Sequence, residues 1–402
     1  MFEVFESWRG CKEVNKEMRY QIVIIILLIL LIICFVNYAV DFGFYLKNRY
    51  CRFHIGRYQN DSQWQDAIEK RAVKWLKKTP TVKITDNSRY MLIDFVSGRY
   101  RSHTIQSWQK AALILGLLYS NNQEYSRFAQ NAAIELIDQN GEWKRKPIAV
   151  DCGMLSYAVL KASDDSIKVK PAMDESLKII KENINSEGMI SYTGGKENPD
   201  MYVDTLGLVC PFLLLYGKTY NDPELEKLAF KQLDMFHDFG LYPGTVLPNH
   251  AFNIDTKLPL GVYGWGRGTA WYIIGLMDSY PLFENELYKT RIKQWLIEAA
   301  DCYMQYQRKD GGFGSILQRT QTYDSSATAV MAWFYVRMEL ICKKDIYINV
   351  SKKCFKKLME CTRITGAIDW CQGDTKDIGV FAQTYDIMPF AQGMTLRAIN
   401  NE

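Results

Sequence analysis

One kind of loop recurs along the chain at irregular intervals of about fifty residues, and it constrains the fold more than any other feature. Each copy combines glycine with aromatic or β-branched residues, and an apolar segment follows it. The copies are NGEWKR at 140, EGMISYTGG at 187, PGTVLPNHAFN at 243, DGGFGSIL at 310 and TGAIDWCQG at 365. From about residue 60 onward, apolar residues spaced three and four apart predict about twelve helices and few, short strands.

A unit of helix, turn, helix and loop that is repeated about six times is what a closed ring of six helical hairpins requires. The sequence therefore predicts an all-α protein, an (α/α)6 barrel. In such a ring the inner helices are parallel, so their N-terminal ends and the loops before them gather at one mouth. We expect the functional residues there.

Residues 20–40 carry no charge, and at about 1.5 Å per residue they match a hydrocarbon core of roughly 30 Å. A secretory signal has a shorter apolar stretch and a small-residue cleavage site, and neither is evident here. We predict a short tail (1–19), a single transmembrane helix (20–40), a linker (41–59) and a barrel domain (60–402). The positive-inside rule gives nearly equal support to both orientations of this segment. The basic residues that flank it are Arg9, Lys12, Lys16 and Arg19 on one side and Lys47, Arg49, Arg52 and Arg57 on the other.

Composition argues against several classes of partner. The net charge of +4 comes from 49 basic and 45 acidic residues that are spread along the chain, so a nucleic-acid partner is not expected. The ten cysteines include no C-x-x-C pair, and most resemble small core residues on helices. We expect no metal and no cofactor, and the sequence leaves the oligomeric state open.

Four aspartates open apolar segments after the recurring loops: Asp151, Asp204, Asp324 and Asp386. One interpretation is that each is an N-cap, which accepts hydrogen bonds from the first free backbone N–H groups of its helix. The other is that several of them surround a cavity, where burial and like charge keep one carboxyl protonated near neutral pH. The two interpretations are compatible.

The stretch GVYGWGRGTAW, residues 261–271, places Arg267 between Trp265 and Trp271 and just before a helical segment. An arginine is suited to hold a carboxylate or sugar oxygens through planar donors, and tryptophan rings can stack on a pyranose. The bland alternative is a glycine-rich turn with the arginine in a surface ion pair. His250, in LPNHAF, lies on a loop among glycine, proline and asparagine, which makes it a second candidate.

These segments also carry a family resemblance. YVDTLGLVCPFLLLYGKTYNDPELEKLAFKQLDMF, the loop to His250, GWGRGTAWYIIGLMDSYP, and the later DSSATAVMAWFYV and YDIMPFAQGMTLRAI follow one another in order over roughly residues 60–400. The chain resembles the unsaturated glucuronyl and rhamnogalacturonyl hydrolases of glycoside hydrolase families 88 and 105.

The resemblance implies an (α/α)6 barrel that removes a 4,5-unsaturated uronic acid from the non-reducing end of lyase-generated oligosaccharides by hydrating its vinyl ether. It implies that Asp204 is the catalytic acid/base and that Asp151 is a second acidic residue that holds sugar hydroxyls. By the same resemblance, His250, Trp265, Arg267 and Trp271 bind substrate. A barrel outside the cytoplasmic membrane is expected, because lyase products are met there.

Two rival functions stay open at this point. One is a catalytically silent barrel that binds acidic glycan at a membrane. The other is a different α/α-toroid enzyme, either a polysaccharide lyase or an ordinary glycosidase.

Overall fold

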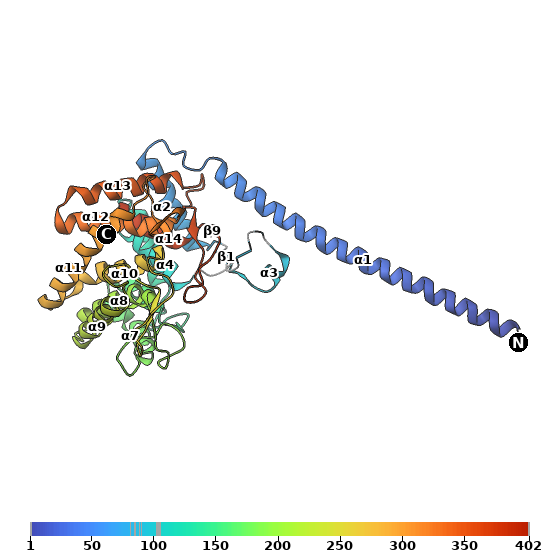
Figure 1. Ribbon diagram of the computed structural model, residues 1–402, viewed down its shortest axis with the longest axis horizontal. Helices are drawn as coiled ribbons and strands as arrows, with labels where there is room; N and C mark the ends of the chain where they lie inside the picture. The colour runs from blue at the N-terminus through green and yellow to red at the C-terminus, as the bar shows by residue number, and fades with distance from the viewer. Residues whose placement is uncertain are drawn as a thin grey trace. The chain divides into compact units, whose positions relative to one another are not determined.

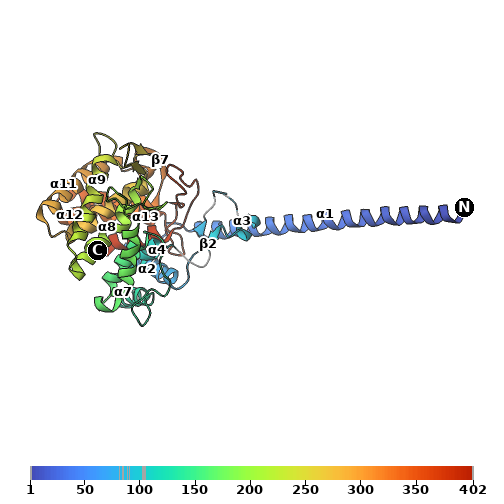
Figure 2. The ribbon, with the colours of Figure 1, turned by 90° about the horizontal axis from the view of Figure 1, so that it is seen from below.

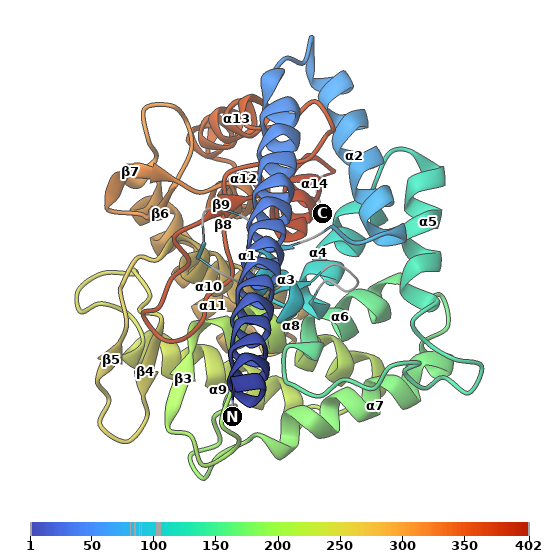
Figure 3. The same cartoon turned by 90° about the vertical axis from the view of Figure 1, so that its right-hand side faces the viewer.

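The structure, a computed structural model, describes residues 2–80, 82–83, 86–87, 89, 91–101 and 106–400. It divides into two compact units, one made of residues 1–53 with 87–99 and the other of residues 54–86 with 100–402. The larger unit is a ring of helices (Figures 1 and 3).

Six helices form the inner wall of the larger unit. They pack in the closed order α4, α6, α8, α10, α12, α14 and back to α4. Their bounds are α4 (Ser107–Leu118), α6 (Cys152–Ala162), α8 (Val203–Tyr220), α10 (Gly266–Ser279), α12 (Ser325–Cys342) and α14 (Pro389–Ile399). Every residue of α10 is buried, as expected of a wall with protein on both sides.

An outer helix packs against the inner wall beside each inner helix. The outer helices are α2 (Asp61–Lys77), α5 (Gln123–Ile134), α7 (Ser166–Glu182), α9 (Glu224–Phe239), α11 (Glu286–Tyr303) and α13 (Asp345–Glu360). They are amphipathic, with one buried stripe each. Among the described residues this makes twelve barrel helices in six pairs, and the predicted (α/α)6 barrel is confirmed.

The ring closes where α4 meets α14, and glycine allows it. A Cβ placed on Gly116 would lie 2.4 Å from the carbonyl oxygen of Gly393, and one on Gly393 would lie 2.2 Å from the backbone of Ala112. The two helices therefore touch backbone to backbone. An alanine at either position would force the first and last inner helices apart.

The remaining elements are short. They are β1 (Val82–Lys83), α3 (Leu92–Val96), β2 (Tyr100–Arg101), β3 (Asp200–Tyr202), β4 (Ala251–Asn253), β5 (Pro259–Leu260), η1 (Tyr280–Leu282), η2 (Met304–Tyr306), β6 (Gly314–Ile316), β7 (Arg319–Tyr323), β8 (Cys371–Gln372) and β9 (Tyr385–Asp386). All strand pairs are antiparallel: β1 with β2, β3 with β4 and β4 with β5, β6 with β7, and β8 with β9. Several of these strands lie directly before inner helices, where the recurring loops were predicted.

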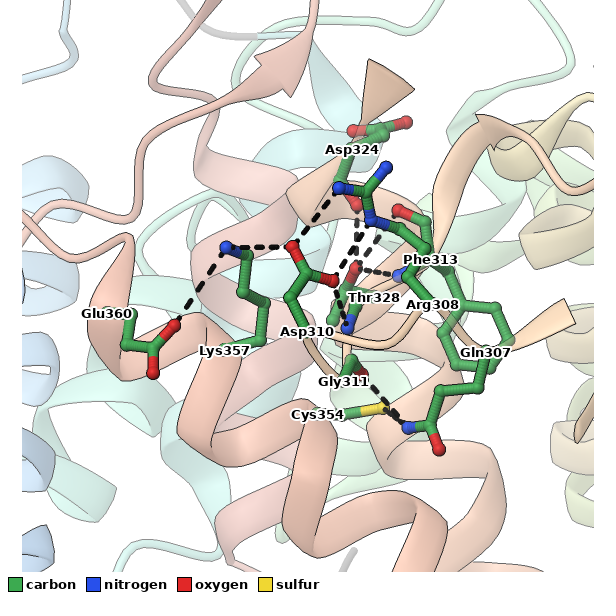
Figure 4. Close-up of polar contacts among 11 residues, drawn as sticks. Gln307, Arg308, Asp310, Gly311, Phe313, Asp324, Thr328, Cys354, Lys357 and Glu360 are labelled. Atoms are coloured by element: carbon green, nitrogen blue, oxygen red, sulfur yellow. Dashed lines mark hydrogen bonds and ion pairs between the residues drawn. The ribbon is translucent and has the colours of Figure 1, made fainter. Parts of the chain in front are cut away.

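The loop DGGFGSIL shows how such a loop is held (Figure 4). Asp310 accepts hydrogen bonds from Nε of Arg308 (3.0 Å) and from the backbone N–H of Gly312 (3.2 Å), and it pairs with Nζ of Lys357 (3.0 Å). Burial raises the pKa of Asp310, but these donors outweigh burial and hold the pKa below its usual value. The loop is thus fastened to outer helix α13 before the chain enters β6.

The N-cap interpretation holds for one of the four aspartates. Asp324 caps α12 by accepting from the backbone N–H of Ser326 (2.9 Å). Asp151 occupies the cap position of α6 but makes no cap hydrogen bond. Asp204 lies within the first turn of α8, whose N-cap is Tyr202, and α14 begins after Met388, so Asp386 is not its cap. For Asp204 and Asp386 the N-cap interpretation was wrong.

The smaller unit is dominated by α1 (Phe2–Phe53), a helix of 52 residues. Its stretch Lys16–Phe53 contains a window of mean hydropathy 3.2 that is not buried. By length and composition this helix is a candidate membrane span, a property that signal sequences near an N-terminus share. It runs through part of the predicted linker, and the predicted domain boundaries stay a prediction.

Candidate active site

A cavity of about 300 Å³ opens beside the N-terminal ends of inner helices α4, α8 and α10. Four residues that the sequence singled out line it: Asp204, His250, Arg267 and Trp271. The other lining residues are Trp108, Tyr192, Thr193, Tyr202, Leu208, Asp374, Thr375, Lys376 and Asp377.

A short sheet brings Asp204 and His250 together from positions far apart in the sequence. Strand β3 pairs with β4 in the register Tyr202 with Ala251, and the backbone N–H of Val203 donates to the carbonyl of His250 (2.9 Å). Asp204 is the second residue of α8, which follows β3 directly, and His250 stands just before β4. The two side chains therefore meet at the cavity, with His250 Nε2 at 3.6 Å from Asp204 Oδ2.

Asp204 has the chemistry of an acid. Its Oδ2 atom is buried and has no hydrogen-bond partner among the described residues. Burial raises the pKa of Asp204 to about 7, against the opposing positive charge of Arg267 and with a smaller contribution from the negative charge of Asp374. Near neutral pH a large fraction of this carboxyl is therefore protonated, and it faces a cavity that can admit a ligand.

His250 is neutral under the same conditions. Burial and the positive charge of Arg267 lower the pKa of His250 to about 4, although Asp377 acts in the opposite direction. Its Nδ1 atom accepts a hydrogen bond from the backbone N–H of Gly379 (3.1 Å). That bond assigns the ring proton to Nε2, so His250 presents an N–H donor toward Asp204.

Arg267 is buried, and its guanidinium mainly holds a loop. Nη1 donates to the carbonyl of Gln372 (2.8 Å), and Nη2 donates to the carbonyl of Gly373 (2.7 Å) and to Oγ1 of Thr375 (3.1 Å). It also stacks over Trp265 at 5.1 Å. With both Nη2 hydrogens used, the full planar fork expected for a substrate carboxylate is not free, although the guanidinium still borders the cavity.

The tryptophans divide into two roles. Trp271 and Trp108 line the cavity and meet edge to face, with ring centroids 5.6 Å apart. Trp265, predicted as a binding residue, is buried and is not among the residues that line the cavity. Its Nε1 donates to Oε1 of Gln372 (3.1 Å), and its ring packs against His250 at 4.7 Å. Trp265 thus supports His250 and the loop at 372.

The other predicted acids lie apart from this cavity lining. Asp151, proposed as a second catalytic residue, accepts from Oγ of Ser107 (2.9 Å) and is not a lining residue. Its charge nevertheless reaches Tyr192, whose pKa burial raises most, with further increases from Asp204 and Asp151. Asp324 caps α12 and does not line the cavity, and Asp386 forms an ion pair with Arg363 (2.7 Å).

Sequence reasoning missed the segment 374–377, which supplies two carboxylates and a lysine to the cavity wall. Lys376 forms an ion pair with Asp86, which also accepts from the backbone N–H of Gln383 (3.1 Å). A signal existed, because GDTKD continues the recurring loop that begins at 365. Tyr192 likewise lies inside the recurring loop at 187, so the repeat itself identified its neighbourhood.

With this geometry in place, comparison with known proteins identifies the chain. The family model described as Glycosyl Hydrolase Family 88 matches residues 69–399. The protein belongs to glycosyl hydrolase family 88. It is therefore a glycoside hydrolase, and the predicted family resemblance is confirmed. None of the curated proteins matches the chain in sequence.

Solved structures with the same fold include relatives from three bacteria. A possible member of the GH105 family from Salmonella enterica serovar Paratyphi A is 16% identical, with a TM-score of 0.69 over 86% of this chain and 94% of that one. The unsaturated glucuronyl hydrolase of Bacillus sp. GL1, described as responsible for glycosaminoglycan degradation, is 18% identical, with a TM-score of 0.63 over 84% and 96%. A glycosyl hydrolase family 88 protein from Bacteroides vulgatus is 15% identical, with a TM-score of 0.56 over 74% and 91%. At these identities the likeness concerns the fold.

Proposed function

We propose that this glycoside hydrolase removes a 4,5-unsaturated uronic acid from the non-reducing end of oligosaccharides that a polysaccharide lyase has produced. The observation that carries the proposal is Asp204, a buried carboxyl at the cavity with a pKa of about 7, whose Oδ2 has no hydrogen-bond partner in the described part of the chain. A group that must donate a proton and then accept one works best when its pKa lies near the working pH. The relative from Bacillus sp. GL1 acts on unsaturated glucuronyl substrates, as its name states.

In the proposed reaction, the protonated Asp204 carboxyl gives its proton to C4 of the sugar, and the C4=C5 electron pair forms the new C–H bond. Positive charge develops at C5, where the ring oxygen shares it. A water molecule adds at C5 and returns a proton to the Asp204 carboxylate. The acid is thereby regenerated.

The resulting hemiketal then opens. Its C5–O bond to the ring oxygen breaks, which leaves a ketone at C5 and a hemiacetal at C1. The hemiacetal releases the aglycone as an alcohol and leaves an aldehyde at C1. One water molecule is consumed overall, and no second carboxylate has to attack the anomeric carbon, in contrast to ordinary retaining and inverting glycosidases.

The surrounding residues fit this chemistry. The Nε2–H of neutral His250 faces Asp204 Oδ2 and can donate to the carboxylate after proton transfer, or to the attacking water. Trp108 and Trp271 offer ring surface for the pyranose. Arg267 and Lys376 place positive charge at the cavity for a substrate carboxylate, and Asp374 and Asp377 can accept hydrogen bonds from sugar hydroxyls.

The decisive experiment uses a matched pair of disaccharides that differ only in whether the C4–C5 bond of the uronyl residue is double or single. We expect loss of the ultraviolet absorbance of the conjugated double bond and release of the aglycone from the unsaturated member alone. Cleavage of both members would indicate an ordinary glycosidase. Binding without cleavage would indicate a silent barrel, and new absorbance from intact polysaccharide would indicate a lyase. Any of these three outcomes overturns the proposal.

We also propose that α1 anchors the protein in a membrane with the barrel outside the cytoplasm. The support is the exposed apolar window within Lys16–Phe53. Cys51, near the end of α1, should react with an impermeant thiol reagent in intact cells, whereas a cysteine introduced into the tail should not. A Cys51→Ser variant controls for labelling of other cysteines. Labelling of the tail with protection of Cys51 would reverse the orientation.

A further inference from the structure

Within the smaller unit, helix α3 lies against α1 at one level of that helix (Figure 2). The backbone N–H of Leu92, the first residue of α3, donates to Oδ1 of Asn37 (2.7 Å). One helical turn further along α1, Asp41 pairs with Arg89 (2.5 Å). These two polar contacts attach Arg89 and α3 to the end of the apolar run of α1.

The polar groups of this segment are satisfied within it. Asp94 is buried and accepts from Nδ2 of Asn87 (2.5 Å). Its backbone carbonyl accepts from the N–H of Arg99 (2.8 Å) and from Oγ of Ser97 (3.2 Å). The turn is therefore held by its own hydrogen bonds as well as by α1.

The apolar side chains of the same turn point outward. Ile93 is 72% exposed, Phe95 57% and Val96 79%. Three large apolar residues within four positions are thus exposed on one short turn that hydrogen bonds hold in place. Exposed apolar surface of this kind marks a contact with a partner or a membrane.

The position of the turn along α1 points to lipid. On α1, Tyr38 stacks on Phe42 (6.0 Å) and Phe42 stacks on Tyr45 (6.3 Å), and all three rings are exposed. They stand where the uncharged run of residues 20–40 ends. Aromatic side chains at the end of an apolar span mark the membrane–water interface. Asn37 and Asp41, which hold the turn, lie at this same level.

We propose that Ile93, Phe95 and Val96 form a second membrane contact, which enters the interfacial layer of the bilayer that α1 spans. The segment acts as an interfacial anchor: its polar groups bond to α1 and to each other, and its apolar side chains enter the headgroup and acyl boundary. The inference rests on the proposed membrane span of α1. A second protein copy on the same surface is the competing occupant, and the test below separates it from lipid.

The test uses the full chain in phosphatidylcholine vesicles that contain a lipid with a photoreactive diazirine on its acyl chain. After irradiation, the labelled peptides are identified by mass spectrometry. We expect label in residues 20–40 and also in 91–96. The peptide that contains Ile167, an exposed apolar residue at the start of outer helix α7, is the control and should stay unlabelled.

Two variants sharpen the result. The triple change Ile93→Ser, Phe95→Ser and Val96→Ser should abolish label in 91–96 and leave that in 20–40 unchanged. Asn37→Ala removes the acceptor for Leu92 and should reduce label in 91–96 alone. Label in 20–40 without label in 91–96 overturns this inference and leaves the span standing, whereas label in neither overturns both. A parallel sample in vesicles without the photoreactive lipid is treated with a bifunctional protein crosslinker. Crosslinks between copies through 91–96, with no lipid label there, would overturn the inference and assign the surface to a second copy.

Discussion

The substitution Asp204→Asn should lower turnover by orders of magnitude and yet make the folded protein more stable. The reason lies in the buried carboxyl, whose folded pKa is about 7 and whose Oδ2 has no partner among the described residues. In the unfolded chain an aspartate has a pKa of about 3.9. Because the folded pKa is the higher one, Asp204 favours folding at acid pH, and the folded state loses that advantage as pH rises toward 7.

The magnitude follows from the two pKa values. The difference between about 7 in the folded chain and about 3.9 in the unfolded chain corresponds to about 4 kcal/mol of unfolding free energy. Asp204→Asn is neutral in both states and avoids this penalty, so its free energy of unfolding at pH 8 should exceed that of the parent by up to about 4 kcal/mol. The gain should shrink as pH falls toward 4. General acid–base loss should lower kcat by about 100 to 10,000-fold.

The assay pairs thermal unfolding of the full chain at pH 4, 6 and 8 with the ultraviolet assay on the unsaturated disaccharide. Asp66→Asn, on the exposed face of outer helix α2, is the matched control and should change neither measurement. An Asp204→Asn protein that is less stable than the parent at pH 8 would refute the argument from burial. One that keeps near-parent activity would refute the assignment of Asp204 as the acid.

Three further predictions follow from the neighbouring groups. The parent kcat should fall as pH rises through about 7, because the reaction needs protonated Asp204, and a rate that stays flat from pH 6 to 9 would contradict this. A lysine at position 267 cannot form the three hydrogen bonds that Arg267 makes to Gln372, Gly373 and Thr375. In Arg267→Lys, KM should therefore rise and proteolysis near residue 373 should accelerate. If both KM and the rate of proteolysis equal those of the parent, Arg267 has no role in the site. Asp310 has a lowered pKa, so the stability that its charge contributes is present at neutral pH and is lost as pH falls. Asp310→Asn should therefore lower the melting temperature more at pH 7 than at pH 3. An equal loss of melting temperature at both pH values would show that the charge of Asp310 is not involved.

The architecture could be predicted from the sequence because it depends on local patterns. Helical spacing of apolar residues and a loop with five copies along the chain predict paired helices in a ring, whatever the side chains do in detail. The same repeat pointed to the mouth of the barrel, where Asp204, His250, Arg267 and Trp271 line one cavity. The candidate membrane span could also be predicted from the uncharged run at 20–40, because it is defined by length and composition alone.

What each polar side chain does was decided by tertiary structure. Asp204, Asp324 and Asp386 look alike in sequence, but only Asp324 caps its helix. The N-cap of α8 lies two residues before Asp204, and the N-cap of α14 lies two residues after Asp386. The pairing of β3 with β4 brought His250 to Asp204 from 46 positions away, and that burial, which no local pattern records, sets both of their pKa values. The guanidinium of Arg267 donates to the backbone carbonyls of the loop at 372. Buried backbone oxygens need a hydrogen-bond donor, and only the tertiary structure decides which side chain supplies it.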